Sequence, residues 1–321
     1  MSVNEFAEKV RKAAQEILGP EYFIEDKENT KLNGVKRRSL IIHSQKGNIA
    51  PMIYLDPYYA DYENGESFGD VMKDIMKMYW DHVPKEDFDL EQILNFDYVK
   101  SRICIKLCNT EKNLTLLEDT AHIEFNDLSI VFFIELDEGP VANGDVLVKE
   151  SFLEEWKTNT EELMKIAMKN SLTRYPPKIQ SMCEFFEGYL MSKVPCMDAM
   201  RQKQIEEFMD RPATLKSLES NLYILSNQRL VNGSACILYP KVIEDFSESV
   251  GSNVYIIPSS IHEVILIPES VVDIEYLTRD EAIENIKGMI AFVNDSELPP
   301  TEFLSYNLYY FDRDKKNITA V

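Results

Sequence analysis

The chain has 321 residues, of which 45% are hydrophobic and 11% aromatic, so it can bury a core and is not disordered. Its formal net charge of -21 argues against nucleic-acid binding and against binding to anionic membranes, because both would repel an acidic surface. We therefore expect a soluble protein of one large or two ordinary domains, with neither nucleic acid nor membrane as a partner.

The N-terminal sequence MSVNEFAEKVRKAAQ has no continuous apolar stretch, so it does not predict a signal peptide. No run reaches the roughly 18 apolar residues that would span a bilayer. The five cysteines are odd in number and scattered, which favours reduced, buried thiols. These features predict a cytoplasmic protein.

The first half of the chain predicts helices around a small sheet. Apolar residues at helical spacing predict helices over residues 6–18 and 68–79, the second with Val71, Ile75 and Met78 on its buried face. Strands are predicted over residues 40–42, 49–55, 103–107, 121–125 and 129–136.

Residues 137–145 contain two glycines, a proline and three acids, and we place a domain boundary there. The pairs Thr158 with Glu161 and Thr278 with Glu281 each predict a capping box at a helix start. Val293 is expected on the buried face of the second of these helices. Residues 179–218 are expected to be helical.

The stretch 222–268 holds most of the turn signals. Residues 222–225 and 236–239 predict two strands of a hairpin that turns at Asn232-Gly233. A helix follows and stops at Gly251, and residues 254–257 and 264–267 predict two more strands. The order hairpin, proline, helix also describes residues 40–79, which leaves a duplicated unit as an alternative.

Ser259, His262 and Glu263 are the sharpest candidates for catalysis, since a hydroxyl, an imidazole and a carboxylate are the groups of nucleophilic catalysis. Catalytic triads are assembled from separate elements, however, so a turn after Pro258 is the competing interpretation. Cys236 is a second candidate nucleophile with His262 downstream, against the alternative of a buried thiol.

Binding candidates are Asn227 and Asn232 in a turn-rich loop, and Tyr58 and Tyr62, because tyrosine is enriched in interfaces. No glycine-rich phosphate motif is present, so no cofactor is expected. Cys104 and Cys108 would lie about 13 Å apart on a strand, too far to share a metal ion, so no metal site is expected.

Three segments resemble an uncharacterised bacterial family known only as a domain of unknown function, chiefly from anaerobic Gram-positive bacteria. They are Tyr223-Ile224-Leu225-Ser226-Asn227, Asn232-Gly233-Ser234-Ala235-Cys236-Ile237-Leu238-Tyr239-Pro240 and Tyr255-Ile256-Ile257-Pro258-Ser259-Ser260-Ile261-His262-Glu263-Val264. The tail at 308–313 is similar to the same family. The resemblance implies a bacterial, cytoplasmic protein and adds no activity.

The sequence therefore predicts an α+β fold of two abutting α+β units, residues 1–140 and 141–321, each with a small, largely antiparallel sheet and packed helices. With no convergent catalytic set, we expect a non-enzymatic binding or interaction module whose partner is another protein or a peptide. The alternative is a hydrolase that uses Ser259 or Cys236 with His262.

Overall fold

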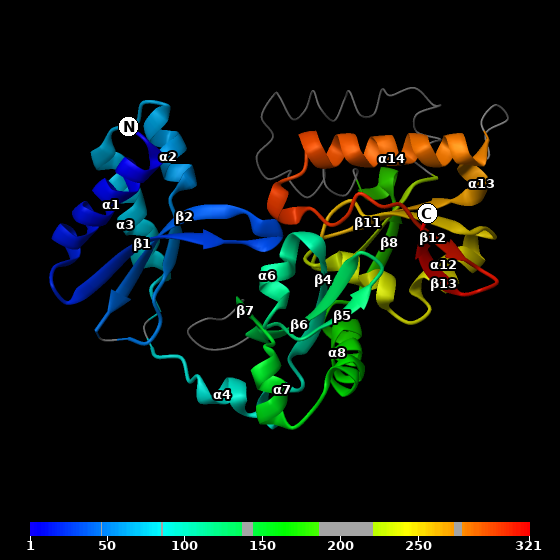
Figure 1. Cartoon of the computed structure of the whole chain (residues 1–321), viewed down its shortest axis with the longest axis horizontal. Coiled ribbons are helices and arrows are strands. Elements are labelled where there is room, and N and C mark those ends of the chain that lie inside the picture. The colour runs from blue at the N-terminus through cyan, green and yellow to red at the C-terminus, as the bar shows by residue number, and fades with distance from the viewer. Residues whose placement is uncertain (46, 85, 137–143, 186–220, 273–277) are drawn as a thin grey trace. The chain divides into compact units, whose positions relative to one another are not determined.

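The protein is an α+β protein built from several antiparallel sheets with packed helices (Figure 1). The computed structural model describes the chain except residues 46, 85, 137–143, 186–220 and 273–277. By its internal contacts the chain divides into two compact units, residues 1–102 with 134–146, and residues 103–133 with 147–321.

The first unit packs helices against one face of a three-stranded antiparallel sheet ordered β1-β2-β3. Its elements are α1 (Val3–Leu18), β1 (Tyr22–Thr30), the 3-10 turn η1 (Leu32–Gly34), β2 (Lys36–Ser44), β3 (Met52–Tyr54), α2 (Asp56–Glu63), α3 (Phe68–His82), α4 (Glu91–Leu94) and α5 (Phe96–Val99). Phe6, Leu40 and Ile75 are fully buried in its core. The predicted helices and strands are present here, and β1 was not predicted.

The second unit contains a six-stranded sheet and most of a four-stranded sheet, of which residues 134–136 and 144–146 are grouped with the first unit. The four-stranded sheet has β6 at its centre, and all nine residues of β6 are buried, as its apolar sequence predicts. Its elements are β4 (Ile103–Asn109), η2 (Glu111–Asn113), α6 (Leu114–Leu117), β5 (His122–Phe125), β6 (Leu128–Leu136), β7 (Gly144–Leu147), α7 (Glu150–Trp156) and α8 (Thr160–Arg174). Helix α8 packs on β4, where the Ser171 hydroxyl accepts from the Ile105 amide at 3.0 Å.

The six-stranded sheet has the order β13-β12-β10-β11-β9-β8, and its strands pair antiparallel. Its elements are β8 (Pro177–Ser181), β9 (Tyr223–Asn227), η3 (Gly233–Leu238), α12 (Val242–Val250), β10 (Val254–Ile257), β11 (Val264–Pro268), α13 (Glu269–Val272), α14 (Arg279–Ser296), η4 (Pro300–Glu302), β12 (Tyr309–Asp312) and β13 (Asn317–Ala320).

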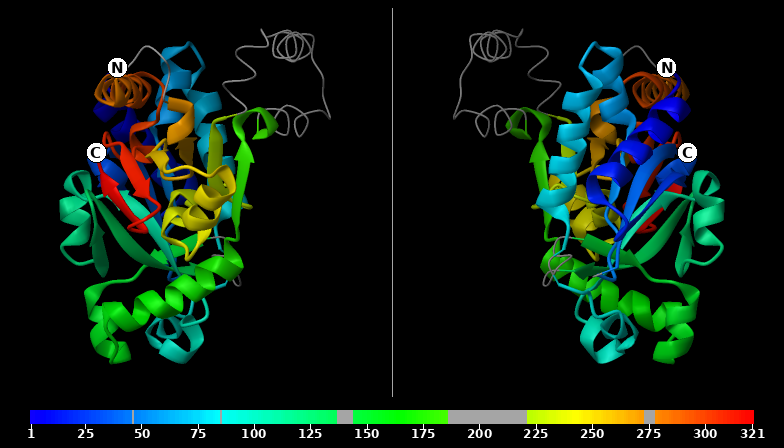
Figure 2. Two further views of the ribbon diagram at one scale, coloured as in Figure 1. Left: turned by 90° about the vertical axis from the view of Figure 1, so that its right-hand side faces the viewer. Right: turned by 90° about the vertical axis from the view of Figure 1, so that its left-hand side faces the viewer.

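Helices α14 and α12 cover opposite faces of this sheet, and Figure 2 shows α14 nearly end-on. Ile286 and Ile290 of α14 pack with Tyr255. Phe246 of α12 meets the ring of Tyr223 at 4.9 Å between centroids. Because successive side chains of a strand point to opposite faces, alternating apolar residues supply both layers.

Several local predictions were wrong. Residues 236–238 lie in the 3-10 helix η3, and Tyr239 is its C-cap, so these residues form no strand and no hairpin with β9. The similarity to the order of elements in residues 40–79 is therefore lost. Ile179 lies in strand β8 and not in the expected helix over 179–218, whereas residues 182–185 are helical as predicted. Residues 186–218 of that prediction fall outside the described residues. Met78 is 43% exposed, because the buried face of α3 is occupied by Tyr79 and not by Met78. Val293 is 42% exposed although it lies on the same face as the buried Ala282 and Ile290, in the last turn of α14.

Candidate functional site

The turn between β10 and β11 carries the predicted catalytic residues Ser259, His262 and Glu263. The serine hydroxyls in this turn form hydrogen bonds to another residue of the same turn. The Ser260 hydroxyl donates to Glu263 Oε1 at 2.8 Å, and Ser259 lies 3.4 Å from the same oxygen. Ser260 Oγ also accepts from the backbone amide of His262 at 2.9 Å. The geometry brings both serines to Glu263 and closes a tight turn.

His262 faces the loop before η3. Its Nδ1 accepts from the Asn232 backbone amide at 3.2 Å, and its carbonyl accepts from the Ser226 hydroxyl at 2.7 Å. Within the described part of the chain, no hydrogen bond joins the His262 ring to Ser259 or to Cys236. The structure therefore brings His262 to Asn232 and not to either candidate nucleophile.

Cys236 is fully buried in η3. Burial raises the pKa of its thiol to about 12, with a hydrogen bond from Tyr239 acting in the opposite direction. A nucleophilic thiolate needs the reverse environment, with a cation or a helix N-terminus to lower the pKa. At neutral pH this thiol is protonated.

The side chains of the predicted binding residues Asn227, Tyr58 and Tyr62 contact other residues of the protein. Asn227 is 1% exposed; its side chain donates to the Val231 carbonyl at 2.7 Å and accepts from the Arg229 amide at 2.9 Å. Tyr58 and Tyr62 of α2 are half-buried against the core of the first unit.

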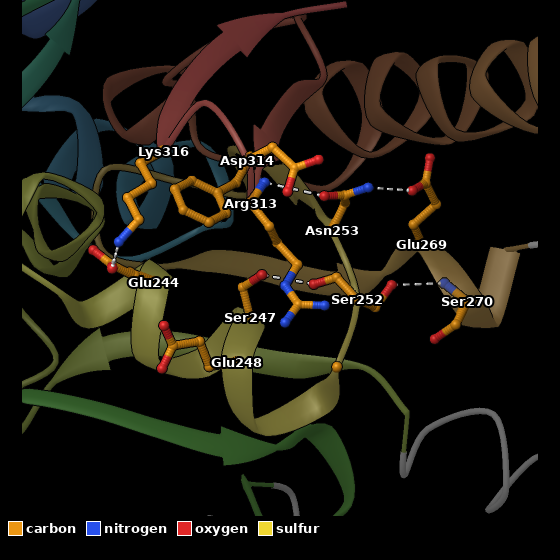
Figure 3. Close-up of a pocket in the computed structure, with 12 residues that line it drawn as sticks. Glu244, Ser247, Glu248, Ser252, Asn253, Glu269, Ser270, Arg313, Asp314 and Lys316 are labelled. Carbon is orange, nitrogen blue, oxygen red and sulfur yellow. Dashed lines mark hydrogen bonds and ion pairs between the residues drawn. The ribbon is translucent and has the colours of Figure 1, made fainter.

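A polar cavity of about 520 Å³ lies where α12 ends, beside the ends of β10 and β12. We call it the α12–β12 pocket. Three segments line it: residues 244–253, residues 269–270 and residues 311–316. Figure 3 shows side chains from all three segments directed toward one another.

Hydrogen bonds between the segments fix the polar floor of the pocket (Figure 3). Asn253 donates through Nδ2 to Glu269 at 2.8 Å and accepts through Oδ1 from the Arg313 amide at 3.1 Å. Ser252 Oγ accepts from the Ser270 amide at 3.0 Å. The Ser247 hydroxyl donates to the Ser252 carbonyl at 2.6 Å, which holds the chain as it leaves α12.

Two acidic residues of the pocket are already neutralised. Glu244 forms an ion pair with Lys316, and this contact raises the pKa of the lysine. Glu269 pairs with Arg279 at 3.2 Å and accepts from the Tyr310 hydroxyl at 3.0 Å. Burial, and then the bond to Glu269, raise the pKa of Tyr310 to about 12.

Three charged side chains of the pocket are left without such partners. Across the residues that the structure describes, the Arg313 guanidinium and the Glu248 and Asp314 carboxylates make no hydrogen bond or ion pair. The Arg313 side chain runs toward Ser252 and the C-terminal turn of α12 (Figure 3). A cation is favoured at that end of a helix, because the backbone carbonyls there are partly unsatisfied.

The α12–β12 pocket was not predicted from the sequence. Its residues come from three separate segments with no shared motif, and the sequence after Asp312 reads only as a polar tail. The one signal was the dense mixture of acidic and basic residues at 312–316.

A family model described as "Family of unknown function (DUF5688)" matches residues 3–313. Comparison with curated proteins found no match, and comparison with solved structures also found none. No helix in the described ranges is long and apolar enough to cross a membrane. Among the same residues, no group of three or more His, Cys, Asp or Glu side chains could hold a metal ion.

Proposed function

We propose that this chain, which belongs to the DUF5688 family of unknown function, is a non-enzymatic binding protein whose site is the α12–β12 pocket. Its ligand is a small molecule that carries both a negative and a positive group. The observation behind this proposal is the placement of Arg313, Glu248 and Asp314 around one cavity, where their charged groups make no hydrogen bond or ion pair within the described chain.

The chemistry of these groups defines the ligand. A guanidinium binds a carboxylate through two parallel hydrogen bonds, so Arg313 would hold the negative group. Glu248 and Asp314, with the carbonyl end of α12, would hold an ammonium group. A volume of about 520 Å³ lies in the range of small-molecule sites, which bury most of a ligand in roughly 300–1,000 Å³. A free α-amino acid has both groups on one carbon.

The contacts of the candidate nucleophiles support binding over catalysis. The hydroxyls of Ser259 and Ser260 are directed to Glu263, and the Cys236 thiol has a pKa of about 12. A general base must reach the proton that it removes, and the His262 ring accepts from a backbone amide.

A protein or peptide partner, expected from the sequence, would reach this pocket through a terminal residue that supplies one charged group. We also propose a bacterial protein with a cytoplasmic location. The four described cysteines Cys104, Cys108, Cys183 and Cys236 are free thiols, and cytosolic conditions keep thiols reduced.

Isothermal titration calorimetry tests the proposal. The panel would contain free glycine, its amide, its N-acetyl derivative and glycylglycine. Free glycine should bind most tightly, and Arg313→Gln should weaken its binding by at least tenfold, the loss of one charge-assisted pair. Arg37→Gln, the same change in β2 of the first unit, is the control. Equal binding by wild type and Arg313→Gln, or no binding by any member, would refute the proposal.

A further inference from the structure

A second cavity, of about 390 Å³, adjoins the α12–β12 pocket. We call it the η3–β13 cavity. The two cavities share three lining residues, Glu244, Phe311 and Lys316. The remaining lining of the second cavity is mainly apolar and includes Phe125, Ile237, Leu238, Ile243 and Ile318. A polar and an apolar cavity therefore meet at one wall.

The ion pair of Lys316 with Glu244 forms part of this wall. Lys316 lies in the turn between β12 and β13 in a left-handed conformation, with φ of 52°. Its side chain is 60% exposed, so water competes for the ammonium group. An exposed ion pair of this kind is a weak contact, and a ligand could displace it.

We infer that the two cavities form one bipartite site for an amphiphilic ligand, with a zwitterionic head and an unbranched alkyl chain. This inference rests on the proposed function, which assigns the head to the α12–β12 pocket. The chain enters the η3–β13 cavity past Lys316, where Phe311 is common to both cavities and gives the chain an apolar surface. The head alone would leave the apolar cavity unused.

A homologous series of α-amino acids tests the inference by calorimetry. Glycine, 2-aminobutyric acid, norleucine and 2-aminooctanoic acid share one head and differ only in alkyl length. If the chain is buried, affinity should rise about fourfold for each added methylene, until the cavity is full. Glycine has no chain and reports the head site alone.

Two variants locate the chain. Ile318 lies on the edge strand β13 and is half-buried, so the Ile318→Ser variant should fold. In this variant the increase in affinity from glycine to norleucine should be several-fold smaller than in the wild type. Lys316→Met removes the ion pair with Glu244, and it should increase the affinity for 2-aminooctanoic acid relative to glycine. The control is Ile41→Ser, a half-buried position in β2 of the first unit.

The outcomes separate the two proposals. Glycine binding that needs Arg313, with affinity independent of chain length, would overturn the bipartite site and leave the proposed function standing. A chain-length gain that is unaffected by Ile318→Ser would also overturn it, because the chain would then lie elsewhere. Failure of every member to bind would overturn both. Circular dichroism and thermal melting of each variant exclude loss of fold as the cause.

Discussion

The Asn232 backbone amide donates a hydrogen bond to Nδ1 of His262 across 3.2 Å. This bond connects the loop before η3 to the turn between β10 and β11. It occupies the lone pair of Nδ1, which a general base would need to accept a proton. The ring is therefore oriented by the backbone of Asn232 and not by a hydroxyl or a thiol.

Activity-based labelling tests this interpretation. A fluorophosphonate probe for serine nucleophiles and an iodoacetamide probe for cysteines should leave Ser259 and Cys236 of the native protein unlabelled at pH 7.5. The serine is directed to Glu263 and the thiol is buried and protonated. Mass spectrometry of tryptic peptides gives the readout. Labelling of wild type that is lost in Ser259→Ala or Cys236→Ala would support the hydrolase instead.

Gly233 should tolerate no side chain. A Cβ at this position would overlap Ser226 Oγ and the His262 carbonyl and would lie 2.8 Å from the Asn227 amide. Two of these neighbours are backbone atoms of buried or hydrogen-bonded segments, so they cannot move aside easily. Gly233→Ala should lower the free energy of unfolding by about 1–3 kcal/mol or more, measured by urea denaturation.

Gly288 provides the matched control for that substitution. It lies within α14, and a Cβ there would meet nothing within 4 Å. Gly288→Ala should stabilise the protein by about 0.5–1 kcal/mol, because alanine has the higher helix propensity. Equal effects of the two alanine substitutions would show that the close approach at Gly233 is not rigid.

The buried thiols should make the fold sensitive to alkali. Burial raises the pKa of both Cys108 and Cys236 to about 12, whereas an unfolded cysteine ionises with a pKa near 8.5. Between these values the unfolded state loses a proton that the folded state keeps. The stabilising contribution is therefore complete below about pH 8.5 and is lost as pH rises toward 12.

Urea denaturation of Cys236→Ala at two pH values measures this effect. At pH 7 the variant shows only the cost of the lost sulfur. At pH 10 the wild type should have lost about 2 kcal/mol more than the variant, since each pH unit of unequal ionisation is worth about 1.4 kcal/mol. An identical pH dependence in both proteins would mean that the thiol is not desolvated.

Asp127 should be a structural carboxylate that joins the two sheets of the second unit. It accepts from the Ser305 hydroxyl at 2.6 Å through Oδ2 and from the Tyr309 hydroxyl through Oδ1. Tyr309 is fully buried, and burial followed by this bond raises its pKa. Tyr309→Phe should cost about 1.5–3 kcal/mol of unfolding free energy, the value of a hydrogen bond to a charged group.

Tyr306→Phe is the control for that prediction. Its hydroxyl also donates to a carboxylate, Asp295, at 2.7 Å, but the side chain is 44% exposed. The substitution should change the unfolding free energy by about 0.5 kcal/mol or less, since water replaces the lost partner. Thermal denaturation of both variants compares the losses of unfolding free energy. A larger loss for Tyr309→Phe would show that burial of the hydroxyl, and not the hydrogen bond alone, determines the loss.

Several elements were determined by local sequence. The capping box of Thr278 with Glu281 starts α14, and Gly251, with φ of 67°, ends α12. The apolar run of β6 is buried throughout. In each case the signal lies within a few residues, so neighbouring side chains and backbone suffice to specify it. At α8 the cap is displaced by one residue: Asn159 and not Thr158 accepts from the helix, at 2.9 Å from the Glu162 amide.

Tertiary structure alone decided the rest. Residues 236–239 have a strand-like composition, yet 236–238 lie in η3 and Tyr239 caps it. At the start of η3, Gly233 fits against Ser226 and His262 from two other segments. Strand β1 is polar along most of its length and becomes a strand by pairing with β2. The α12–β12 pocket likewise exists only where three segments meet, and hydrogen bonds between residues as distant as Asn253 and Arg313 hold it in place. A pairing of this range depends on the path of the whole chain, which no local pattern encodes.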